Sequence, residues 1–551
     1  MTLKNLLIAN RGEIAIRIAR CTAEAAIRSH AIFSEDDEGS DHVRKADHAH
    51  RLTGKGPAAY LDAAQIVRVA LGAGCDAVHP GYGFLSENAD FARRCMEAGL
   101  IFVGPTPAVL EVFGDKGRAR SLAMKCGVPV LPGTDAPTSV QEARQFLQSL
   151  GADGAIMIKA IAGGGGRGMR QVLASAELDA AYERCRSEAK QAFGNADVYV
   201  EKLFPRARHI EVQVVGDGSG RVTHLWEREC SIQRNRQKLV EIAPAPGLPG
   251  ALREHLIDAA LRMARDVKLR SLATFEFLVE SQAKGPAGFA FIEANPRLQV
   301  EHTVTEEVTG IDLVRAQLDI AGGRTLEELE LVDSQFFSPR GMAMQVRINA
   351  ETMAPDGTVH PSGGVLDAFD PPGGPGVRVD TSAHSGMRVN PRFDSLLAKV
   401  IVHVAGDALP AVTAKARRAL SEFRIAGVAS NREFLLNLLS SADFSGGRWH
   451  TGLIEENLAS LCAPAEHRRF YGEPSSATAS AARVDPFDPL AILTHGRRDI
   501  EAGPSPDELL LPEGTQAVSA VISGTVVSID VRVGDSIQPG QQVAVMEAMK
   551  M

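Results

Sequence analysis

The first 110 residues alternate short apolar runs with stretches of helical periodicity. Residues 6–9, 31–33, 77–79 and 101–103 have the length and composition of buried strands. Residues 13–24 repeat their apolar positions as an amphipathic helix does. Because strands that alternate with helices form βαβ units, this region predicts a mainly parallel, doubly wound sheet of the α/β class.

The pattern changes further along the chain, and a length of 551 residues exceeds what one core uses. Longer strands joined by Gly-rich or polar loops predict an α+β domain, and a region of short strands with Pro/Gly turns follows it. Weak periodicity with frequent Ala, Pro and Ser then indicates a linker. We therefore expect domains at 1–114, 115–335 and 336–447, a linker at 448–515 and a β-rich segment at 516–551.

Composition narrows the class of protein. Hydrophobic residues make up 44% and charged residues 23% of the chain, which is ordinary for a globular protein. The net charge of −9 includes no basic stripe, so nucleic acid is not an expected partner. No apolar run approaches the ~20 residues of a membrane span, and the sequence enters its first strand without a targeting segment. Seven scattered cysteines fit a reducing compartment, and we expect a cytoplasmic protein.

A glycine-rich segment, GGGGRG at residues 163–168, is the first candidate for chemistry. It leads from one apolar run into another rather than into a helix, so it matches neither a dinucleotide fingerprint nor a P-loop. Its backbone amides could close over phosphates, and Lys159 precedes it where an ammonium could meet a phosphate. A tight turn is the alternative, but five glycines and an arginine exceed what a turn needs. We therefore expect nucleotide binding here.

Polar and apolar residues alternate between residues 289 and 301. A period of two places five polar side chains on one face of an extended chain. These are Glu293, Asn295, Arg297, Gln299 and Glu301. Pro296 cannot donate to a ladder, so the strand is expected to lose regularity there. A solvated strand face is the ordinary alternative for such a pattern.

The preceding strand-like run, residues 274–280, changes that interpretation. A hairpin symmetric about the loop between the two runs places Glu276 directly opposite Glu293, with Cβ atoms ~5 Å apart. The two carboxylates repel, and aromatic neighbours indicate that the pair is partly shielded. We therefore favour a metal-binding pair over a pair of surface carboxylates, because a divalent cation would offset the repulsion. Oxygen ligands favour Mg²⁺ or Mn²⁺, and Asn295 could supply a third oxygen.

Five segments resemble the biotin carboxylase family of ATP-grasp enzymes. They are NRGEIA at 10–15, HPGYGFLSEN at 79–88, GGGGRGM at 163–169, APAP at 243–246 and QVEH at 299–302. The resemblance covers residues 1 to about 445 in order and in spacing. It implies a multidomain α/β and α+β fold, with a Rossmann-like N-terminal domain, an ATP-grasp domain and a biotin carboxylase C-terminal domain.

The resemblance also implies how the substrates bind. Lys116 and Lys159 would hold the ATP phosphates, and the glycine loop would cover them. That loop includes Gly164, Gly165 and Gly166. The adenine would be received by Glu201, Lys202, Leu203 and Phe204. The same pocket would be lined by His209 and Gln233. Arg236 departs from the family pattern, because some relatives place a histidine against the nucleotide there. Glu276, Glu293 and Asn295 would bind the metal ion, in agreement with the hairpin argument.

Catalytic roles follow from the same resemblance. The bicarbonate site would be formed by Lys238, Arg297, Gln299, Val300 and Glu301. Glu301 would take the bicarbonate proton so that an oxygen can attack the γ-phosphoryl group of ATP, giving carboxyphosphate. Arg297 would orient the carboxyl fragment, and Arg347 would stabilise the ureido oxygen of biotin as it becomes anionic. A structural ion pair is the alternative role for Arg347.

The end of the sequence resembles a second domain type. EAMKM at 547–551 is similar to the hairpin of biotinyl carrier domains, in which Lys550 would carry biotin. Residues 522–526 and 533–535 have the order and spacing of the first half of that β-rich, lipoyl-like domain. Its second half is missing, which would leave open strand edges. We therefore expect the natural polypeptide to continue, and biotinylation of Lys550 to depend on a complete carrier domain.

The resemblance implies partners and leaves the final acceptor open. A carboxyltransferase subunit or domain and a biotin protein ligase are expected partners, and the chain is expected to form a homodimer or a larger oligomer. Acetyl-CoA, propionyl-CoA, longer acyl-CoAs and pyruvate are all possible acceptors, with acyl-CoA favoured by family habit. Two other classes are weaker alternatives. An ATP-grasp ligase that activates a carboxylate for an amine would not need Arg347, and a silent carrier would not need Lys238, Arg297 and Glu301 together.

Overall fold

The computed structural model describes residues 3–134, 137–151, 154–161, 168–204, 206–280, 288–332, 337–406 and 408–471, with positions 525–529, 531, 534, 536–537 and 543–547. Residues 1–467 form one compact unit and residues 468–548 form a second. Among the described residues, no helix is both long enough and apolar enough to cross a bilayer. All seven cysteines are unpaired.

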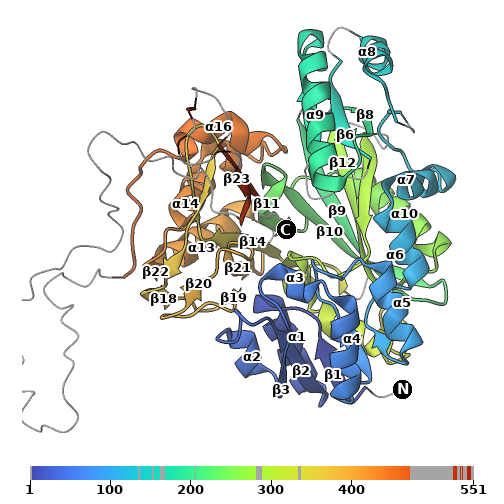
Figure 1. Ribbon diagram of the computed structural model, residues 1–551, viewed down its shortest axis with the longest axis vertical. Coiled ribbons are helices and arrows are strands. Elements are labelled where there is room, and N and C mark those ends of the chain that lie inside the picture. The colour runs from blue at the N-terminus through green and yellow to red at the C-terminus, as the bar shows by residue number, and fades with distance from the viewer. Residues whose placement is uncertain are drawn as a thin grey trace, which may run out of the picture. The chain divides into compact units, whose positions relative to one another are not determined.

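The N-terminal region is built on a five-stranded sheet in the order β3-β2-β1-β4-β5. Its strands are β1 (Asn5–Ile8), β2 (Arg28–Phe33), β3 (His48–Arg51), β4 (Ala77–His79) and β5 (Ile101–Phe102). Figure 1 labels three of these strands, β1, β2 and β3. All four strand pairings of this sheet are parallel, so the predicted doubly wound arrangement is confirmed. The central strands β1 and β4 are short and almost wholly buried, whereas β3 at the edge (HAHR) is mostly exposed.

Of the six helices that the structure describes in this region, three begin at a residue whose side chain caps the helix. The six helices are α1 (Gly12–Glu24), α2 (Asp41–Lys45), α3 (Pro57–Tyr60), α4 (Ala63–Gly72), α5 (Ala89–Glu97) and α6 (Pro107–Gly114). The side chains of Asp62, Asn88 and Thr106 accept the backbone N–H three residues on, at the starts of α4, α5 and α6. Each such cap satisfies a donor that the helix itself leaves open.

An antiparallel sheet of eight strands carries the next two regions, in the order β13-β12-β9-β10-β11-β14-β21-β19. The strands are β9 (Ala207–Asp217), β10 (Val222–Arg234), β11 (Gln237–Ala243), β12 (Arg270–Glu280), β13 (Phe289–Asn295), β14 (Met342–Asn349), β19 (Val377–Thr381) and β21 (Leu396–Val404). Val240 of β11 pairs with Val346 of β14. The regions predicted as separate domains at 115–335 and 336–447 therefore share one continuous sheet.

The two faces of β9 differ in chemistry. Ile210 and Val212 belong to a core cluster with Leu256 of α10 (Gly250–Asp266), and each is fully buried. Burying such an aliphatic side chain contributes roughly 1.5–3 kcal/mol. Glu211 and Gln213 alternate with them on the opposite face and are fully buried too. A buried polar face needs internal partners, because a buried charge without one is costly.

A smaller antiparallel sheet, in the order β7-β6-β8, lies between these parts in the sequence. Its strands are β6 (Ile156–Ala160), β7 (Met169–Val172) and β8 (Val198–Lys202). The helical elements nearby in sequence are α7 (Lys116–Lys125), α8 (Val140–Ser149), η1 (Ser175–Glu177) and α9 (Leu178–Phe193). Ile156, Leu147 and Leu178 form part of a separate hydrophobic cluster, so this piece has a core of its own.

The remaining elements of the first unit are short strands and helices around the end of the large sheet. They are α11 (His302–Thr309), α12 (Leu313–Ala321), β15 (Glu351–Met353), β16 (Val359–Pro361), β17 (Gly364–Val365), β18 (Ala368–Asp370), β20 (Arg388–Val389), α13 (Leu409–Glu422), β22 (Arg424–Ala426), α14 (Arg432–Ser440), α15 (Ala442–Ser445) and α16 (Leu453–Leu461). Helix α13 packs on β14 and β21. The helix thereby covers two of the strands that the predicted domain at 336–447 adds to the sheet.

The predicted linker at 448–515 needs correction at its start. Helix α16 lies inside that range, yet Leu453, Ile454 and Leu461 are buried in the same core as β14 and α14. Residues 448–467 therefore fold with the first unit. In the second unit, β23 (Thr525–Ile529) and β24 (Ala544–Glu547) pair antiparallel. Lys550 lies outside the described residues.

Candidate active site

A lysine with three carboxylates occupies the buried polar face of the large sheet. Lys238 of β11 places its Nζ 2.6 Å from Glu211, 3.1 Å from Glu276 and 2.6 Å from Glu301. Glu211 and Glu276 project from β9 and β12, and Glu301 is the N-cap residue of α11. Burial alone would lower the pKa of Lys238, but the three carboxylates raise it well above its usual value. The lysine is therefore permanently charged.

The same contacts keep the carboxylates ionised. Burial would raise the pKa of Glu211, but Lys238 and Arg228 hold it at about 2. Glu276 has a pKa below its usual range for the same reason, with His209 adding to the effect of Lys238. Burial would also raise the pKa of Glu301, but the nearby charges lower it, and Lys238 has the largest effect among them. At neutral pH these groups are acceptors rather than donors.

Arg347 of β14 joins this cluster from the other side. Its Nε donates to Glu241 of β11 at 2.6 Å, and one of its terminal nitrogens donates to Glu301 at 3.0 Å. Burial raises the pKa of Glu241, and Arg347 opposes that rise. The structural ion pair considered for Arg347 is thus present with Glu241. Arg347 also reaches the predicted base, so it lies where a substrate at Glu301 would meet it.

Arg297 lies beside the cluster, in the loop after β13. Its Nε donates to Glu87 at 2.8 Å, and its two terminal nitrogens donate to Gln299 at 3.0 Å and to Asn295 at 3.2 Å. Strand β13 ends at Asn295, directly before Pro296, so the predicted loss of regularity at this proline is confirmed. The three accepting side chains and the carbonyl oxygen of Leu298, which accepts at 3.1 Å, fix the guanidinium plane and leave Arg297 oriented for a planar anion.

The predicted hairpin is present, with Glu276 paired to Glu293 in the register of β12 and β13. Asn295 donates to Glu276 at 2.8 Å, and His209 Nε2 lies 2.7 Å from the other oxygen of Glu276. His209, Glu211 and Glu276 offer three ligand atoms within 4.8 Å of one another. Carboxylate oxygens fit a hard divalent cation. Glu276 is the member of this group that was expected to bind the metal ion, and a cation held by Glu276, Glu293 and Asn295 together stays a prediction.

The predicted nucleotide residues lie on α7, β6 and β8. Lys159 of β6 is buried and forms an ion pair with Glu201 of β8. Burial lowers the pKa of Lys116, against the pull of Glu293, and Lys159 contributes to the fall. Binding of the ATP phosphates by Lys116 and Lys159 stays a prediction. Gly164, Gly165 and Gly166 lie outside the described residues.

The other predicted nucleotide contacts occupy two places. The Lys202 ammonium lies 5.3 Å from the ring centre of Phe204, and the backbone N–H of Leu203 donates to Ala155. His209 Nδ1 lies 2.6 Å from Gln233 Nε2, beside the cation residues. These side chains therefore border both β8 and the polar face of the large sheet.

Arg236, the departure from the family pattern, lies in a two-residue turn between β10 and β11. Arg234 and Gln237 pair across the turn, and Asn235 and Arg236 have φ values of 47° and 66°. Positive φ at both central positions is typical of a type I′ hairpin turn, and it is costly for arginine. Arg236 donates to the sulfur of Met157 in β6 at 3.3 Å. The turn thus directs this side chain toward the strand that carries Lys159.

Several residues of the cluster were not predicted from the sequence. They are Glu87, Glu211, Arg228, Glu241 and Lys399. The signal for Glu211 was present, because His209, Glu211 and Gln213 alternate with apolar residues as residues 293–301 do. Lys399 of β21 donates to the carbonyl oxygen of Val300 at 3.2 Å and so holds the segment between Gln299 and Glu301. Nothing local in the sequence around residue 399 points to this contact.

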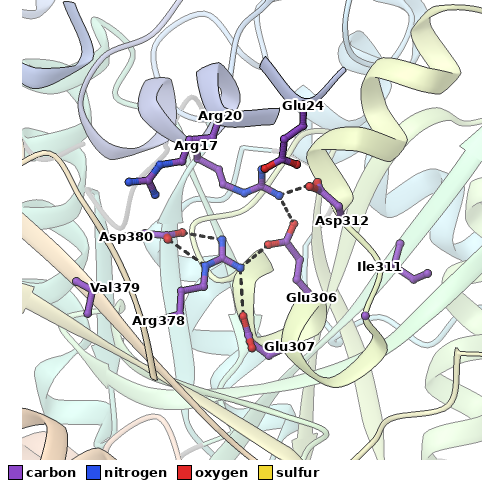
Figure 2. A pocket seen from close by; sticks show the side chains of 11 residues that line it. Arg17, Arg20, Glu24, Glu306, Glu307, Ile311, Asp312, Arg378, Val379 and Asp380 are labelled. Carbon is purple, nitrogen blue, oxygen red and sulfur yellow. Dashed lines mark hydrogen bonds and ion pairs between the residues drawn. The ribbon is translucent and has the colours of Figure 1, made fainter. Parts of the chain in front are cut away.

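A separate hollow of about 390 Å³ lies between α1, α11 and β19. In Figure 2, Arg17 reaches one carboxylate oxygen of Glu306 from above and Arg378 reaches the other from the left. Arg17 lies 2.8 Å from Glu306 and 2.6 Å from Asp312, and Arg378 lies 2.8 Å from Glu306. None of the predicted site residues lines this hollow. The charged side chains that line this hollow form ion pairs mainly with one another.

Comparison with known families covers most of the first unit. Residues 2–110 match the family described as biotin carboxylase, N-terminal domain. Residues 115–329 match the carbamoyl-phosphate synthase L chain, ATP binding domain, and residues 345–456 match the biotin carboxylase C-terminal domain. These three matches follow the predicted order of domains.

Individual proteins give the same picture. The chain is 44% identical to human mitochondrial pyruvate carboxylase over 540 residues, which is 94% of this chain and 44% of that protein. It therefore spans less than half the length of this curated relative. Among solved structures, the biotin carboxylase domain of a single-chain bacterial carboxylase is 50% identical, with a TM-score of 0.73, covering 83% of this chain and 98% of that one.

Two further structures are informative. The biotin carboxylase domain dimer of Hydrogenobacter thermophilus 2-oxoglutarate carboxylase, in complex with MgADP, ADP and bicarbonate, is 39% identical, with a TM-score of 0.79 over 85% of this chain and 100% of that chain. A single-chain, multi-domain long-chain acyl-CoA carboxylase is 41% identical, with a TM-score of 0.73, covering 100% of this chain and 48% of that one. With near-complete coverage of solved biotin carboxylase domains and a matching domain order, this chain belongs to the biotin carboxylase family of ATP-dependent ligases.

Proposed function

We propose that this chain carboxylates biotin at N1′ with bicarbonate and ATP, through carboxyphosphate. The observation that carries the proposal is the position of Glu301, an ionised carboxylate within 3.0 Å of both Lys238 and Arg347. A second anion can bind beside Glu301 only where cations offset the repulsion, and both cations are already there. Arg297 adds a guanidinium whose pKa burial would lower but Glu87 and Glu301 raise.

The first step is phosphoryl transfer. Glu301 takes the proton of bicarbonate, the freed oxygen forms a bond to the γ-phosphorus, and the bond from that phosphorus to ADP breaks. Lys116 and Lys159 supply positive charge near the phosphates, and Glu276, Glu293 and Asn295 would hold Mg²⁺ or Mn²⁺. Such an ion, when bound, neutralises charge on the phosphate oxygens. The remaining bicarbonate residues, Lys238, Arg297, Gln299 and Val300, orient the anion.

The second step transfers the carboxyl group. Carboxyphosphate decomposes to CO₂ and phosphate. The released phosphate takes the N1′ proton of biotin, and the N1′ nitrogen then forms a bond to the carbon of CO₂. Negative charge then accumulates on the ureido oxygen, which Arg347 is placed to stabilise. Glu241 keeps this arginine charged and oriented through its 2.6 Å contact with Nε.

The decisive experiment supplies ATP, Mg²⁺, labelled bicarbonate and free biotin. We expect labelled carboxybiotin and ADP release that depends on biotin. Glu301→Gln removes the base but keeps the shape of the side chain, so turnover should fall by about 10²–10⁴-fold while ATP still binds. Glu254→Gln on the exposed side of α10 is the matched control and should leave turnover unchanged. ADP release without any dependence on biotin contradicts the proposal.

For the complete polypeptide we propose an acyl-CoA as the final carboxyl acceptor. The similarity of the whole chain to a long-chain acyl-CoA carboxylase supports this choice. Pyruvate is a second candidate, supported by the identity to human pyruvate carboxylase over 94% of the chain. The test offers acetyl-CoA, propionyl-CoA, a long-chain acyl-CoA and pyruvate to the full-length natural protein. Carboxylation of pyruvate alone would exclude the acyl-CoA proposal.

The remaining assignments are also proposals. We propose that biotin protein ligase attaches biotin to Lys550 in a complete carrier domain, and that a carboxyltransferase domain or subunit receives the carboxyl group. The dimer of the 2-oxoglutarate carboxylase domain supports a homodimer for this chain. Seven unpaired cysteines support a reducing compartment, for which we propose the cytoplasm. Avidin blotting and sedimentation measure the first and third of these directly.

A further inference from the structure

Three histidines gather at the open edge of the N-terminal sheet, far in sequence from the carboxylate cluster. β3 is the edge strand, and it pairs with β2 in parallel register. His48 and His50 are two residues apart on β3, so they share one face of the strand. His30 of β2 pairs directly with His48. The register thus brings three imidazoles to one face of two neighbouring strands.

A hydrogen bond joins ring nitrogens of His30 and His50, and the ring of His48 lies beside that of His30, although the three ligand atoms do not all lie within 4.8 Å of one another. His30 Nδ1 lies 3.0 Å from His50 Nε2, with ring centres 5.3 Å apart. The ring of His48 lies 4.8 Å from that of His30. His30 is only 5% exposed, and its Nε2 is buried without a hydrogen-bond partner. His48 is exposed, so its side chain can turn without disturbing the core.

Electrostatics favours neutral rings at this edge. Burial lowers the pKa of His30, and the nearby His50 and His48 lower it further. Burial and His48 also lower the pKa of His50. Asp47, whose carboxylate accepts from both the backbone N–H and the hydroxyl of Ser29 at 2.8 Å, has the opposite effect and raises the pKa of His30. Arg28 adds a further charge that opposes protonation of His30. Neutral imidazole is the form that binds metal ions.

We propose that His30, His48 and His50 form a binding site for a borderline transition-metal ion such as Zn²⁺ or Ni²⁺. Metal–nitrogen bonds of about 2.0–2.1 Å in tetrahedral geometry separate two ligand nitrogens by roughly 3.3 Å. The observed 3.0 Å between His30 and His50 therefore needs to open by only a few tenths of an ångström. His48 supplies the third nitrogen after a side-chain rotation, and water completes the coordination. Three imidazoles without a carboxylate select this class of ion over Mg²⁺.

The proposed site is distinct from the cation site of the carboxylation reaction. That site uses oxygen ligands on β12 and β13 of the large sheet, whereas the histidine site lies on β2 and β3. His209 with Glu211 and Glu276 is a second place where Zn²⁺ can bind. The experiment therefore has to count the ions lost with each variant. Saturating Mg²⁺ during the titration competes for the oxygen ligands of the carboxylation site.

The test titrates Zn²⁺ into the full chain, untagged and stripped with a chelator, by calorimetry. The variant His48→Ala/His50→Ala removes two exposed or half-buried rings, and His255→Ala/His360→Ala removes two exposed histidines elsewhere. We expect the wild type and the control to bind one Zn²⁺ at the histidine site. The His48→Ala/His50→Ala variant, called the edge variant, should bind this ion at least tenfold more weakly. Retention on immobilised Ni²⁺ should likewise be weaker for the edge variant than for the wild type and the control.

Two readouts keep the result interpretable. Circular dichroism shows that the edge variant is folded, and the single variant His50→Gln replaces it if it is not. Biotin-dependent ADP release should be unchanged in the edge variant, since no edge histidine belongs to the carboxylation site. Equal Zn²⁺ binding by the wild type and the folded edge variant overturns the proposal, whatever the outcome of the carboxylation assay.

Discussion

Glu211 illustrates how its surroundings set the behaviour of a single carboxylate. It is fully buried, and Lys238 and Arg228 hold its pKa at about 2 despite the opposing effect of burial. A folded-state pKa below the unfolded value contributes stability above the unfolded pKa, and that contribution is lost as the pH falls. We expect the free energy of unfolding to decline as the pH falls from about 4.5 toward 2.

The variant Glu211→Gln isolates this contribution. Its free energy of unfolding should depend less steeply on pH below about 4.5, though not be independent of it, because Glu276 and Glu301 also have lowered pKa values. Urea unfolding at several pH values measures the slope. Glu254→Gln is the exposed control and should keep the slope of the wild type. The same slope in Glu211→Gln and in the wild type would contradict the assignment.

Glu87 is a positioning residue for Arg297. Its side chain is 42% exposed and accepts from Arg297 Nε at 2.8 Å. Partly exposed ion pairs contribute about 0.2–1 kcal/mol, so Glu87→Gln should raise the KM for bicarbonate by roughly fivefold at most. The KM for ATP and the melting temperature should stay the same. Glu97→Gln, near the end of α5, is the control. A rise in the KM for ATP instead would remove Glu87 from this role.

At the level of residues, the sequence predicted the polar face of one strand and missed that of another. The alternation in residues 293–301 predicted a site because the preceding strand places Glu276 opposite Glu293 in a hairpin. Glu211 alternates in the same way, but its partner Lys238 lies two strands further on in the sheet order. Local alternation cannot distinguish a solvated face from a buried one. Long-range partners such as Lys399 and Val300 carry no local signal at all.

At the level of elements, short-range pairings were predictable and long-range pairings were not. The βαβ pattern and the β12–β13 hairpin depend on neighbouring segments, and both are confirmed. The pairing of β11 with β14 joins residues about a hundred positions apart, so two predicted domains turned out to share a sheet. Helix α16 was assigned to a linker because polar residues follow it, although its apolar face packs in the core.

The packing of α16 leads to a prediction about stability. Ile454 is fully buried in the core that includes β14 and α14. Truncation of such a side chain to alanine typically costs about 2–5 kcal/mol, from lost burial and from the cavity that remains. We expect Ile454→Ala to lower the free energy of unfolding by this amount in urea titrations. Leu71→Ala, at a position 50% exposed, should change it by less than about 0.5 kcal/mol. A negligible effect of Ile454→Ala would support the linker assignment for this segment.

At the level of the whole molecule, every described residue of the proposed carboxylation site belongs to the first unit. Residues 1–467 form this unit, and they contain Lys116, Lys238 and Arg347 together with α16. A chain that ends at residue 467 should therefore carboxylate free biotin at a rate within about twofold of the full chain. A chain that ends at residue 447 should be much less stable, because its core loses Leu453, Ile454 and Leu461. Comparing melting temperature and biotin-dependent ADP release across the three chains separates folding from chemistry. Loss of activity in a folded 1–467 chain would mean that residues beyond 467 complete the site.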